Sequence, residues 1–121
     1  MSLPYHFIIA DDEADMLYLL TRVVARAYPS ATITAVDNGQ DALTAFGQTG
    51  ADMLIVDYVM PGMDGITLVR ILRSRNITTP VIVISSTDKA GPHAIAAGAT
   101  LFLEKSVALQ QLPQAIANIL P

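Results

Sequence analysis

The sequence contains no cysteine among its 121 residues. Neither a disulfide nor a thiolate metal site can form, and this absence fits a cytosolic protein. Long hydrophobic runs are also missing, since none approaches the roughly 20 apolar residues that a membrane-crossing helix requires. The chain does not open with the pattern of a secretory signal peptide. We therefore expect a cytoplasmic protein that has no membrane partner.

Charged residues are few, and their balance is slightly acidic. Asp, Glu, Lys and Arg make up 15% of the chain, and the formal net charge is -4. Such a balance argues against direct binding of nucleic acid, which needs a basic surface. The sequence shows no long repeats, low-complexity tracts or interdomain linkers, and its length suits one domain. We expect residues 1–121 to form a single domain.

Apolar residues are abundant, at 52% of the chain. They form short runs that we expect to be strands, at residues 5–10, 31–36, 53–56, 80–85 and 100–103. Apolar runs that are continuous, and do not alternate with polar residues, are typical of strands buried on both faces of a parallel sheet. A segment with helical spacing follows each run. Alternation of five strands with five helices predicts an α/β sheet with right-handed crossovers.

Two prolines limit the last two expected helices. Pro92 is tolerated at a first helical position, and Gly91 and Gly98 bracket the segment, so we expect a small helix at residues 92–97. We place Pro113 in the first turn of the final helix. Deeper in that helix it would remove a hydrogen bond and clash with the preceding turn, at a cost of about 3 kcal/mol.

Polar side chains stand where the expected strands end. They are Asp11, Asp12, Asp57, Ser85 and Lys105. In sheets of this kind, ligands bind at the carboxyl ends of the strands. If the first and third strands are neighbours, their carboxylates converge, and like charges so close destabilise the site unless a cation neutralises them. Oxygen ligands of this kind favour Mg²⁺, which binds through one or two carboxylates together with phosphate.

Lys105 and Ser85 could then contact a transferred phosphoryl group, the lysine as a point charge and the serine as a hydrogen-bond donor. Electrostatics and positioning are most of what phosphoryl transfer requires. Asp57 alone would more often be a helix cap or a turn former, but Asp12 and Lys105 beside it favour a functional site. We assign the adjacent Glu13 to the helix N-terminus, where an acid contributes about 0.3 to 1 kcal/mol.

In this order and at strand ends, these residues resemble the receiver (phosphoacceptor) domain of two-component response regulators, the CheY-like family. The family's acidic pair is similar to Asp11 and Asp12, and its phosphoacceptor, in a segment that here ends MPGMDG, is similar to Asp57. The remaining similar positions are Ser85 for the hydroxyl, Lys105 for the lysine and, in the segment GATLFLEKS, Phe102 for the aromatic switch. The likeness covers nearly the whole chain.

The resemblance implies a doubly wound, flavodoxin-like fold with five parallel strands in the order 2-1-3-4-5, flanked by five helices. It implies that Asp57 accepts a phosphoryl group from a phosphohistidine on a sensor histidine kinase or a phosphotransfer protein. Mg²⁺ would be held by Asp12 and Asp57, by the main-chain carbonyl of Val59, and by Asp11 through water. The chain would be a regulatory phosphoprotein that catalyses only its own phosphotransfer and dephosphorylation.

The resemblance also implies a switch. Ser85 would move toward the phosphoryl group and Phe102 would turn inward behind it, which alters the face made by the fourth helix, the fifth strand and the fifth helix. An output domain or a downstream protein could respond to this face, and a phosphorylation-dependent dimer could form through it.

Two departures from the family pattern lead to specific expectations. The segment between Ser85 and Lys105 is shorter than the family norm, so we expect a stunted or irregular fourth helix. Ser106 stands where the family usually has a proline after a commonly cis bond. A cis bond costs about 0.5 to 1 kcal/mol before proline but about 2.5 to 4 kcal/mol before serine. We therefore expect a trans bond between Lys105 and Ser106 and a rearranged following loop, with Lys105 still directed toward Asp57.

Three other functions compete with this one. A phosphatase of the haloacid dehalogenase type also uses Asp, Lys and Mg²⁺, but its nucleophile follows the first strand in an Asp-x-Asp arrangement, whereas Asp11 and Asp12 are adjacent. A flavin-binding module of the same topology needs a hydroxyl-rich phosphate loop after the first strand, where this chain has acids. A pseudo-receiver that docks partners without being phosphorylated stays open as an alternative.

Overall fold

The structure, a computed structural model, describes residues 4–121. At its centre lies a five-stranded parallel sheet in the order β2-β1-β3-β4-β5. The strands are β1 (His6–Ala10), β2 (Thr32–Val36), β3 (Met53–Asp57), β4 (Val81–Ser85) and β5 (Leu101–Glu104). This order and this pairing confirm the expected doubly wound, flavodoxin-like fold.

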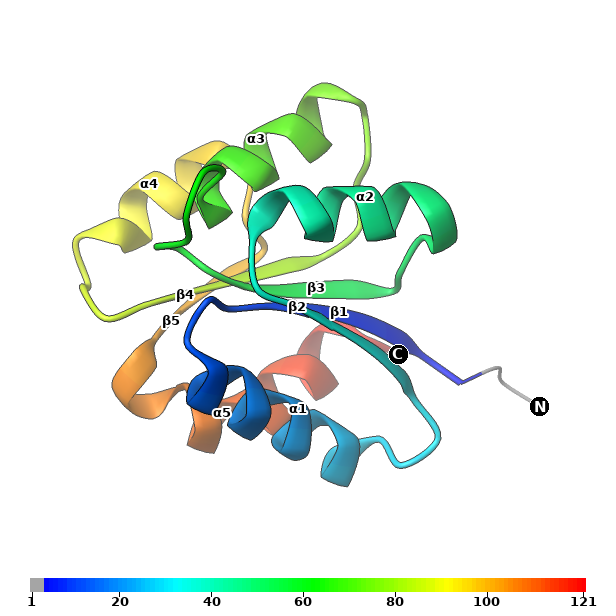
Figure 1. The fold of residues 1–121 in the computed structure, drawn as a ribbon. Coiled ribbons are helices and arrows are strands. Elements are labelled where there is room, and N and C mark those ends of the chain that lie inside the picture. Colours follow the sequence, from blue (N-terminus) through cyan, green and yellow to red (C-terminus); the bar gives the residue numbers. More distant parts are fainter. Residues whose placement is uncertain (1–3) are drawn as a thin grey trace.

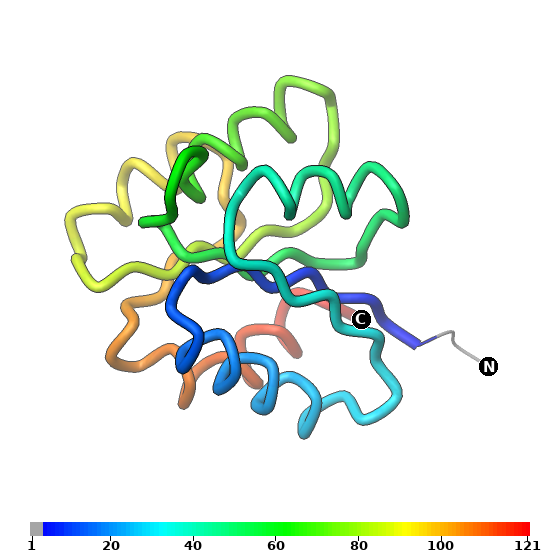
Figure 2. The backbone as a smooth tube through the Cα atoms, in the orientation of Figure 1, coloured from blue at the N-terminus to red at the C-terminus, as the bar shows by residue number. Residues whose placement is uncertain are grey.

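Four helices connect the strands and a fifth follows the last strand, and together they cover both faces of the sheet (Figure 1). They are α1 (Ala14–Ala27), α2 (Gly39–Thr49), α3 (Gly65–Ser74), α4 (Ala90–Ala97) and α5 (Lys105–Ile119). Helices α1 and α5 lie on one face, and α2, α3 and α4 lie on the other, as the backbone tube also shows (Figure 2). Within residues 4–121, every helix falls short of the length and apolar content of a membrane-spanning segment.

Side chains that alternate along the central strands supply two hydrophobic cores, one on each face of the sheet. In β3, Leu54 and Val56 belong to the core under α2, α3 and α4, whereas Met53 and Ile55 belong to the core over α1 and α5. All four side chains are fully buried. Burial of a side chain of this size contributes about 1.5 to 3 kcal/mol. Packing on both faces therefore fixes the position of β3, and its last residue, Asp57, is held at the carboxyl end of the strand.

Side-chain caps set where two of the helices begin. The side chain of Asn38 accepts a hydrogen bond of 2.8 Å from the amide of Asp41 and so caps the N-terminus of α2, which begins at Gly39. The side chain of Asp64 accepts a bond of 2.7 Å from the amide of Thr67 at the start of α3. The loop that follows Asp57 thus ends at the capped N-terminus of α3.

Helix α4 begins at Ala90, earlier than the predicted residues 92–97. Gly91 lies inside the helix, where its missing side chain leaves room for Phe102, since a Cβ at that position would be 3.1 Å from Cδ2 of the ring. Pro92 still lies in the first turn, where amides have no partner within the helix. With 8 residues the helix makes about two turns, which confirms the prediction of a stunted fourth helix.

The prediction for Pro113 was wrong, because this residue lies well inside α5. The helix is buried on both sides of the proline, through Ala108 and Leu112 before it and Ala115 and Ile116 after it. Burial of these side chains against the sheet outweighs the roughly 3 kcal/mol that an interior proline costs. Tertiary packing, and not local propensity, therefore sets the length of this helix.

Candidate functional site

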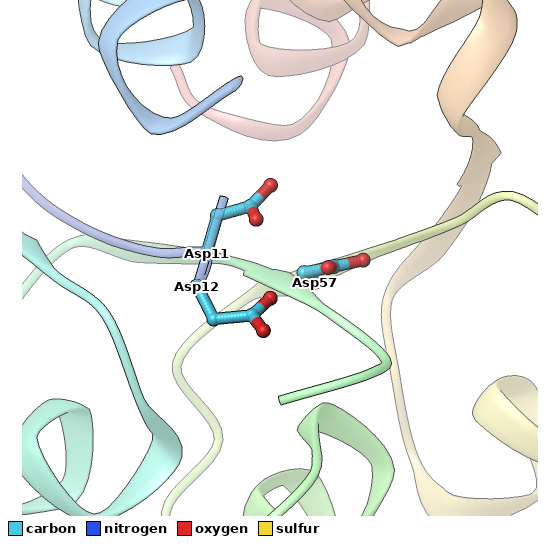
Figure 3. Close-up of side chains that lie close together, drawn as sticks. All are labelled: Asp11, Asp12 and Asp57. Atoms are coloured by element: carbon cyan, nitrogen blue, oxygen red, sulfur yellow. The ribbon is translucent and has the colours of Figure 1, made fainter. Parts of the chain in front are cut away.

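Three carboxylates meet at the carboxyl ends of β1 and β3. Ala10 is paired with Val56 in the sheet, so Asp11 and Asp57 follow side by side. Asp11, Asp12 and Asp57 each offer an oxygen atom, and these atoms lie within 4.8 Å of one another (Figure 3). The predicted convergence of the acidic side chains is therefore confirmed, because β1 and β3 are neighbours in the sheet.

Backbone contacts hold two of these acids in place. The amide of Asp11 donates to the carbonyl of Val36 at 3.1 Å, and Oδ1 of Asp11 accepts a 2.9 Å bond from the amide of Glu13. On β3, the chain after Asp57 folds back so tightly that a Cβ at Gly65 would lie 2.4 Å from the Asp57 carbonyl oxygen. Only glycine fits there. The loop therefore brings the start of α3 directly against the strand end.

Burial makes negative charge costly at this edge of the sheet. The pKa of Asp57 is raised to about 6, first by burial and then by the charge of Asp11, against the opposing effect of Lys105. Burial also raises the pKa of Asp11, although the Glu13 amide and Lys105 oppose it. Oδ2 of Asp11 is buried and has no hydrogen-bond partner within residues 4–121. A cation would satisfy this oxygen and lower the repulsion.

The donor set fits Mg²⁺, a hard ion that takes oxygen ligands and keeps several waters. Asp11 and Asp57 are buried, while Asp12 is exposed at the rim. A cavity of about 240 Å³ opens there, and it is lined by Asp12, Glu13, Asp57, Val59, Ser86 and Lys105. The cavity gives room for waters and for an anionic group beside the carboxylates.

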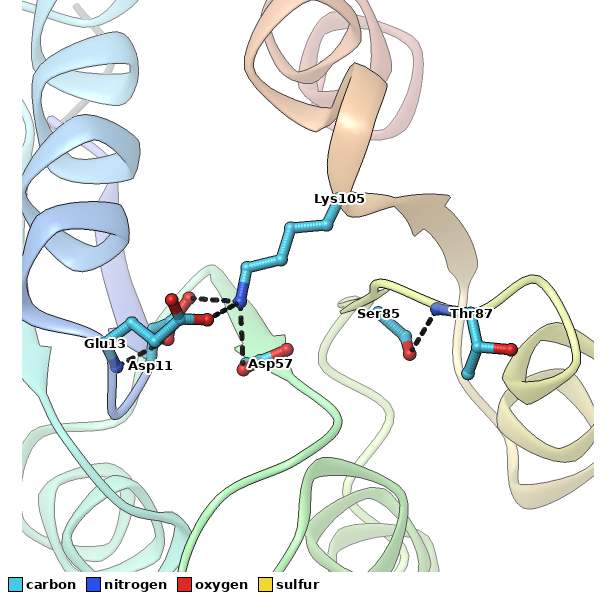
Figure 4. A network of polar contacts seen from close by, with 6 residues as sticks. All are labelled: Asp11, Glu13, Asp57, Ser85, Thr87 and Lys105. Atoms are coloured by element: carbon cyan, nitrogen blue, oxygen red, sulfur yellow. Dashed lines mark hydrogen bonds and ion pairs between the residues drawn. The ribbon is translucent and has the colours of Figure 1, made fainter.

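Lys105 brings a positive charge into the same cluster (Figure 4). Its Nζ lies 3.5 Å from Oδ2 of Asp57 and 3.9 Å from Oδ2 of Asp11, and it also donates to Oε1 of Glu13. Burial lowers the pKa of Lys105, but the Glu13 hydrogen bond and the charges of Asp57 and Asp11 outweigh burial and raise it. The lysine is therefore firmly charged.

The backbone around Lys105 confirms the prediction of a trans bond, but the prediction of a rearranged loop after Lys105 was wrong. No peptide bond in residues 4–121 is cis, so the bond between Lys105 and Ser106 is trans as expected. Helix α5 begins at Lys105 itself, directly after β5, so no loop separates the two elements. The first residue of the helix thus carries the ammonium toward Asp57.

Two predicted residues lie outside the cluster. The hydroxyl of Ser85 is buried and accepts a 3.2 Å bond from the amide of Thr87, as Figure 4 shows, while the next residue, Ser86, lines the cavity. Phe102 is half-buried and packs against Gly91 of α4. In this state neither side chain contacts Asp57 through a hydrogen bond.

Glu13 is a member of the site that the sequence interpretation missed. It does stand at the N-cap of α1, as assigned, but its side chain makes no cap hydrogen bond there. Its carboxylate binds Lys105, which is 92 positions away in the chain. Only the fold brings the two residues together, so the sequence offered no local signal beyond the run of acids after β1.

Known proteins are similar to this chain in sequence. The family described as response regulator receiver domain matches residues 7–117. TrcR, a transcriptional regulatory protein of Mycobacterium tuberculosis, is 24% identical over 119 residues, which are 97% of this chain and 46% of TrcR. A protein-glutamate methylesterase/protein-glutamine glutaminase of Myxococcus xanthus is 32% identical over 109 residues, which are 88% of this chain and 31% of that protein. The chain spans less than half the length of these curated relatives.

Solved structures agree with the sequence relatives. The signal receiver domain of NarL from Mycobacterium tuberculosis superposes with a TM-score of 0.88 at 26% identity, over 98% of this chain and 97% of that one. A receiver domain of a Francisella response regulator superposes with a TM-score of 0.83 at 25% identity, over 95% of each chain. With the family matched over nearly all of its length, the chain belongs to the response regulator receiver domains of two-component signalling.

Proposed function

We propose that this domain is a phosphorylation-dependent signalling switch in which Asp57 is the phosphoacceptor. One observation carries the proposal: the buried Asp57 carboxylate stands beside two further acids and a lysine, at the mouth of an open cavity. Nucleophile, charge-balancing groups and space for a phosphoryl group thus meet in one place. The donor is a phosphohistidine on a sensor histidine kinase or a phosphotransfer protein.

In the transfer, a carboxylate oxygen of Asp57 attacks the phosphorus atom and forms a new O–P bond. The P–N bond to the donor histidine breaks, and its electron pair stays on the imidazole nitrogen, which then takes a proton. Lys105 supports the reaction as a fixed positive charge that faces the incoming oxygens. Burial of Asp57 keeps competing water away from most of the carboxylate.

Mg²⁺ would be held by Asp12 and Asp57 directly, by the main-chain carbonyl of Val59, and by Asp11 through water. When bound, the ion neutralises carboxylate charge and the charge that develops on the transferred group. The side chains of the domain contribute the rest: Asp11 is anchored by the Glu13 amide, and Asp57 is anchored at the end of β3.

The switch that follows phosphorylation involves Ser85 and Phe102. The Ser85 hydroxyl, now an acceptor for the Thr87 amide, would turn to donate to a phosphoryl oxygen. Phe102 would move inward as the loop after β4 shifts. Ser85 precedes the loop that leads to α4, and Phe102 packs against Gly91 of that helix, so the face formed by α4, β5 and α5 would change shape.

The relatives indicate what kind of partner could bind the face formed by α4, β5 and α5. One of them is a transcriptional regulatory protein and another is a methylesterase, and each is longer than this chain. An output domain or a downstream protein is therefore the expected recipient of the signal, with a phosphorylation-dependent dimer as one form of output. We propose a regulatory role in the cytoplasm, without enzymatic turnover of an external substrate.

The test uses a small acyl-phosphate donor with Mg²⁺ and measures intact mass. We expect the mass of one phosphoryl group to be added to the wild type and none to be added to Asp57→Asn, because an amide is a far poorer nucleophile. A label that persists on another residue of this variant would refute the assignment. A wild type that takes up no phosphoryl group would favour the pseudo-receiver instead.

A further inference from the structure

The ammonium of Lys105 is surrounded by three carboxylates before any phosphoryl group arrives. It donates to Glu13, its closest partner, and lies 3.5 Å from Oδ2 of Asp57 and 3.9 Å from Oδ2 of Asp11. A lysine ammonium carries three hydrogens. Glu13 and Asp57 accept hydrogen bonds from it, and Asp11 adds an ion pair at longer range, as the dashed contacts in Figure 4 show. A phosphoryl oxygen therefore competes with these carboxylates for Lys105.

The three neighbours differ in how easily they can leave. Asp11 is fully buried and Asp57 is 4% exposed, and both have short side chains fixed at strand ends. The Glu13 side chain is longer and 64% exposed, and no cap hydrogen bond ties it to α1. An exposed ion pair is a weak one that exchanges readily for water. Glu13 is therefore the partner that can release Lys105 at the least cost.

Glu13 also lines the cavity in which the phosphoryl group would stand. A phosphorylated side chain carries a charge of about -1.5 to -2 near neutral pH. The Glu13 carboxylate would therefore repel the group that Lys105 attracts. Occupation of the lysine and repulsion of the phosphoryl group act in the same direction.

We propose that Glu13 is a positioning residue that holds Lys105 in the unphosphorylated domain and must release it when Asp57 becomes phosphorylated. The contact between Glu13 and Lys105 thus opposes phosphorylation and sets how tightly the domain holds a phosphoryl group. This inference rests on the proposed role of Asp57 as phosphoacceptor.

The first experiment measures the affinity for fluoroberyllate, a phosphoryl analogue, by fluorine NMR in the presence of Mg²⁺. Glu13→Gln removes the charge and the ion pair with Lys105, whereas Glu13→Asp keeps the charge but shortens the side chain. Asp15→Asn is the matched control, because it removes a nearby negative charge from the same helix turn without touching Lys105. We expect both Glu13 variants to bind about two- to fivefold more tightly than the wild type, the range of an exposed ion pair. Asp15→Asn should match the wild type.

Each outcome either supports or contradicts the proposed role of Glu13. Equal affinity of all four proteins would overturn the inference, and so would a Glu13→Asp variant that matches the wild type, because charge alone would then explain Glu13→Gln. If the wild type neither binds fluoroberyllate nor takes up a phosphoryl group, the proposed function itself fails. Binding by the wild type without any effect of Glu13 defeats only this inference.

A second experiment does not depend on phosphorylation. A double-mutant cycle of Glu13→Gln and Lys105→Gln, followed by thermal unfolding in the absence of metal, measures the coupling of the two side chains. We expect Lys105→Gln to shift the unfolding midpoint differently in the Glu13→Gln background. Fully additive shifts would show that the pair does not form in solution.

Discussion

Asp57 is the residue whose charge costs the domain most. Its pKa is raised from 3.8 to about 6, so between these values the folded protein keeps a proton that the unfolded chain has released. The stability tied to the protonated form is present below pH 3.8 and is lost as the pH rises through about 6. The ionised Asp57 that phosphoryl transfer needs thus lowers the free energy of unfolding.

We therefore expect Asp57→Asn to be more stable than the metal-free wild type near neutral pH. The unfolding midpoint should rise by a few degrees, since 1 kcal/mol is worth about 4 °C in a domain of this size. The difference should shrink near pH 4, where Asp57 is protonated in the wild type. Thermal unfolding with a chelator at both pH values checks this. A difference between the two midpoints that stays the same at both pH values would contradict it.

Mg²⁺ should stabilise the wild type, by about 2.7 kcal/mol at a concentration of 100 times the dissociation constant.

Lys105 is assigned to the phosphoryl group and not to the metal. Lys105→Ala should leave Mg²⁺ affinity largely intact, because the ammonium repels the cation and supplies no ligand. The variant should respond weakly to phosphorylation, because no positive charge then draws the phosphoryl oxygens and the loop together. Calorimetric Mg²⁺ titration, together with NMR shifts of Phe102 on phosphorylation, separates these effects. Loss of Mg²⁺ affinity by orders of magnitude would reject this division of roles.

Val59 bears on the lifetime of the phosphorylated state. Its side chain is 64% exposed at the rim of the cavity and offers no polar atom to a water molecule. Val59→Asn should hasten the loss of the phosphoryl group, since an amide there can orient the attacking water. Decay of the phosphorylated protein, followed by intact mass, is the measurement, with Val59→Leu as the apolar control. Unchanged or slower decay would count against a role for this position.

At the scale of elements, Arg73 joins parts of the chain that neither helix propensity nor hydrophobic pattern connects. Its guanidinium donates to the carbonyls of Ile77 and Thr79 before β4 and to the carbonyl of Gly98 after α4, at 2.8 to 3.0 Å. Gly98 also lies so close that a Cβ there would be 2.8 Å from Cγ of Arg73. One side chain thus ties the end of α3 to two loops.

Arg73→Lys should lower the free energy of unfolding by about 1 to 3 kcal/mol, because a single ammonium cannot reproduce the fork of the guanidinium and leaves carbonyls without a donor. Urea unfolding measures the change. Arg70→Lys on the same helix is the control, since Arg70 is exposed. Equal stability of the two variants would mean that the three contacts contribute nothing.

The existence of every strand and helix could be predicted from the sequence, because apolar runs and helical spacing reflect burial directly. The ends of elements were less predictable. Gly91 was taken as a helix boundary, although it lies inside α4 and packs closely against the ring of Phe102. Pro113 was taken as an early residue of α5, although burial on both sides of it extends the helix. In both cases a tertiary contact overrides a local preference.

At the scale of the whole molecule, the carboxylate cluster could be predicted on the condition that β1 and β3 are neighbours, and the resemblance supplied that order. The contact of Lys105 with Glu13 could not be predicted, because it depends on where α5 begins relative to α1. The site is thus a property of the sheet edge, and its finer contacts depend on the helices that start there.

The shortness of α4 has a mechanical consequence. Arg73 fixes the C-terminal end of this helix through Gly98, while its N-terminal end rests on Phe102 through Gly91. If the helix pivots about its C-terminal contact with Arg73, the part that moves is only about 12 Å long at 1.5 Å per residue. A part this short converts a given rotation into a small displacement of the outer surface. Most of the signal read by a partner would then have to come from β5 and α5.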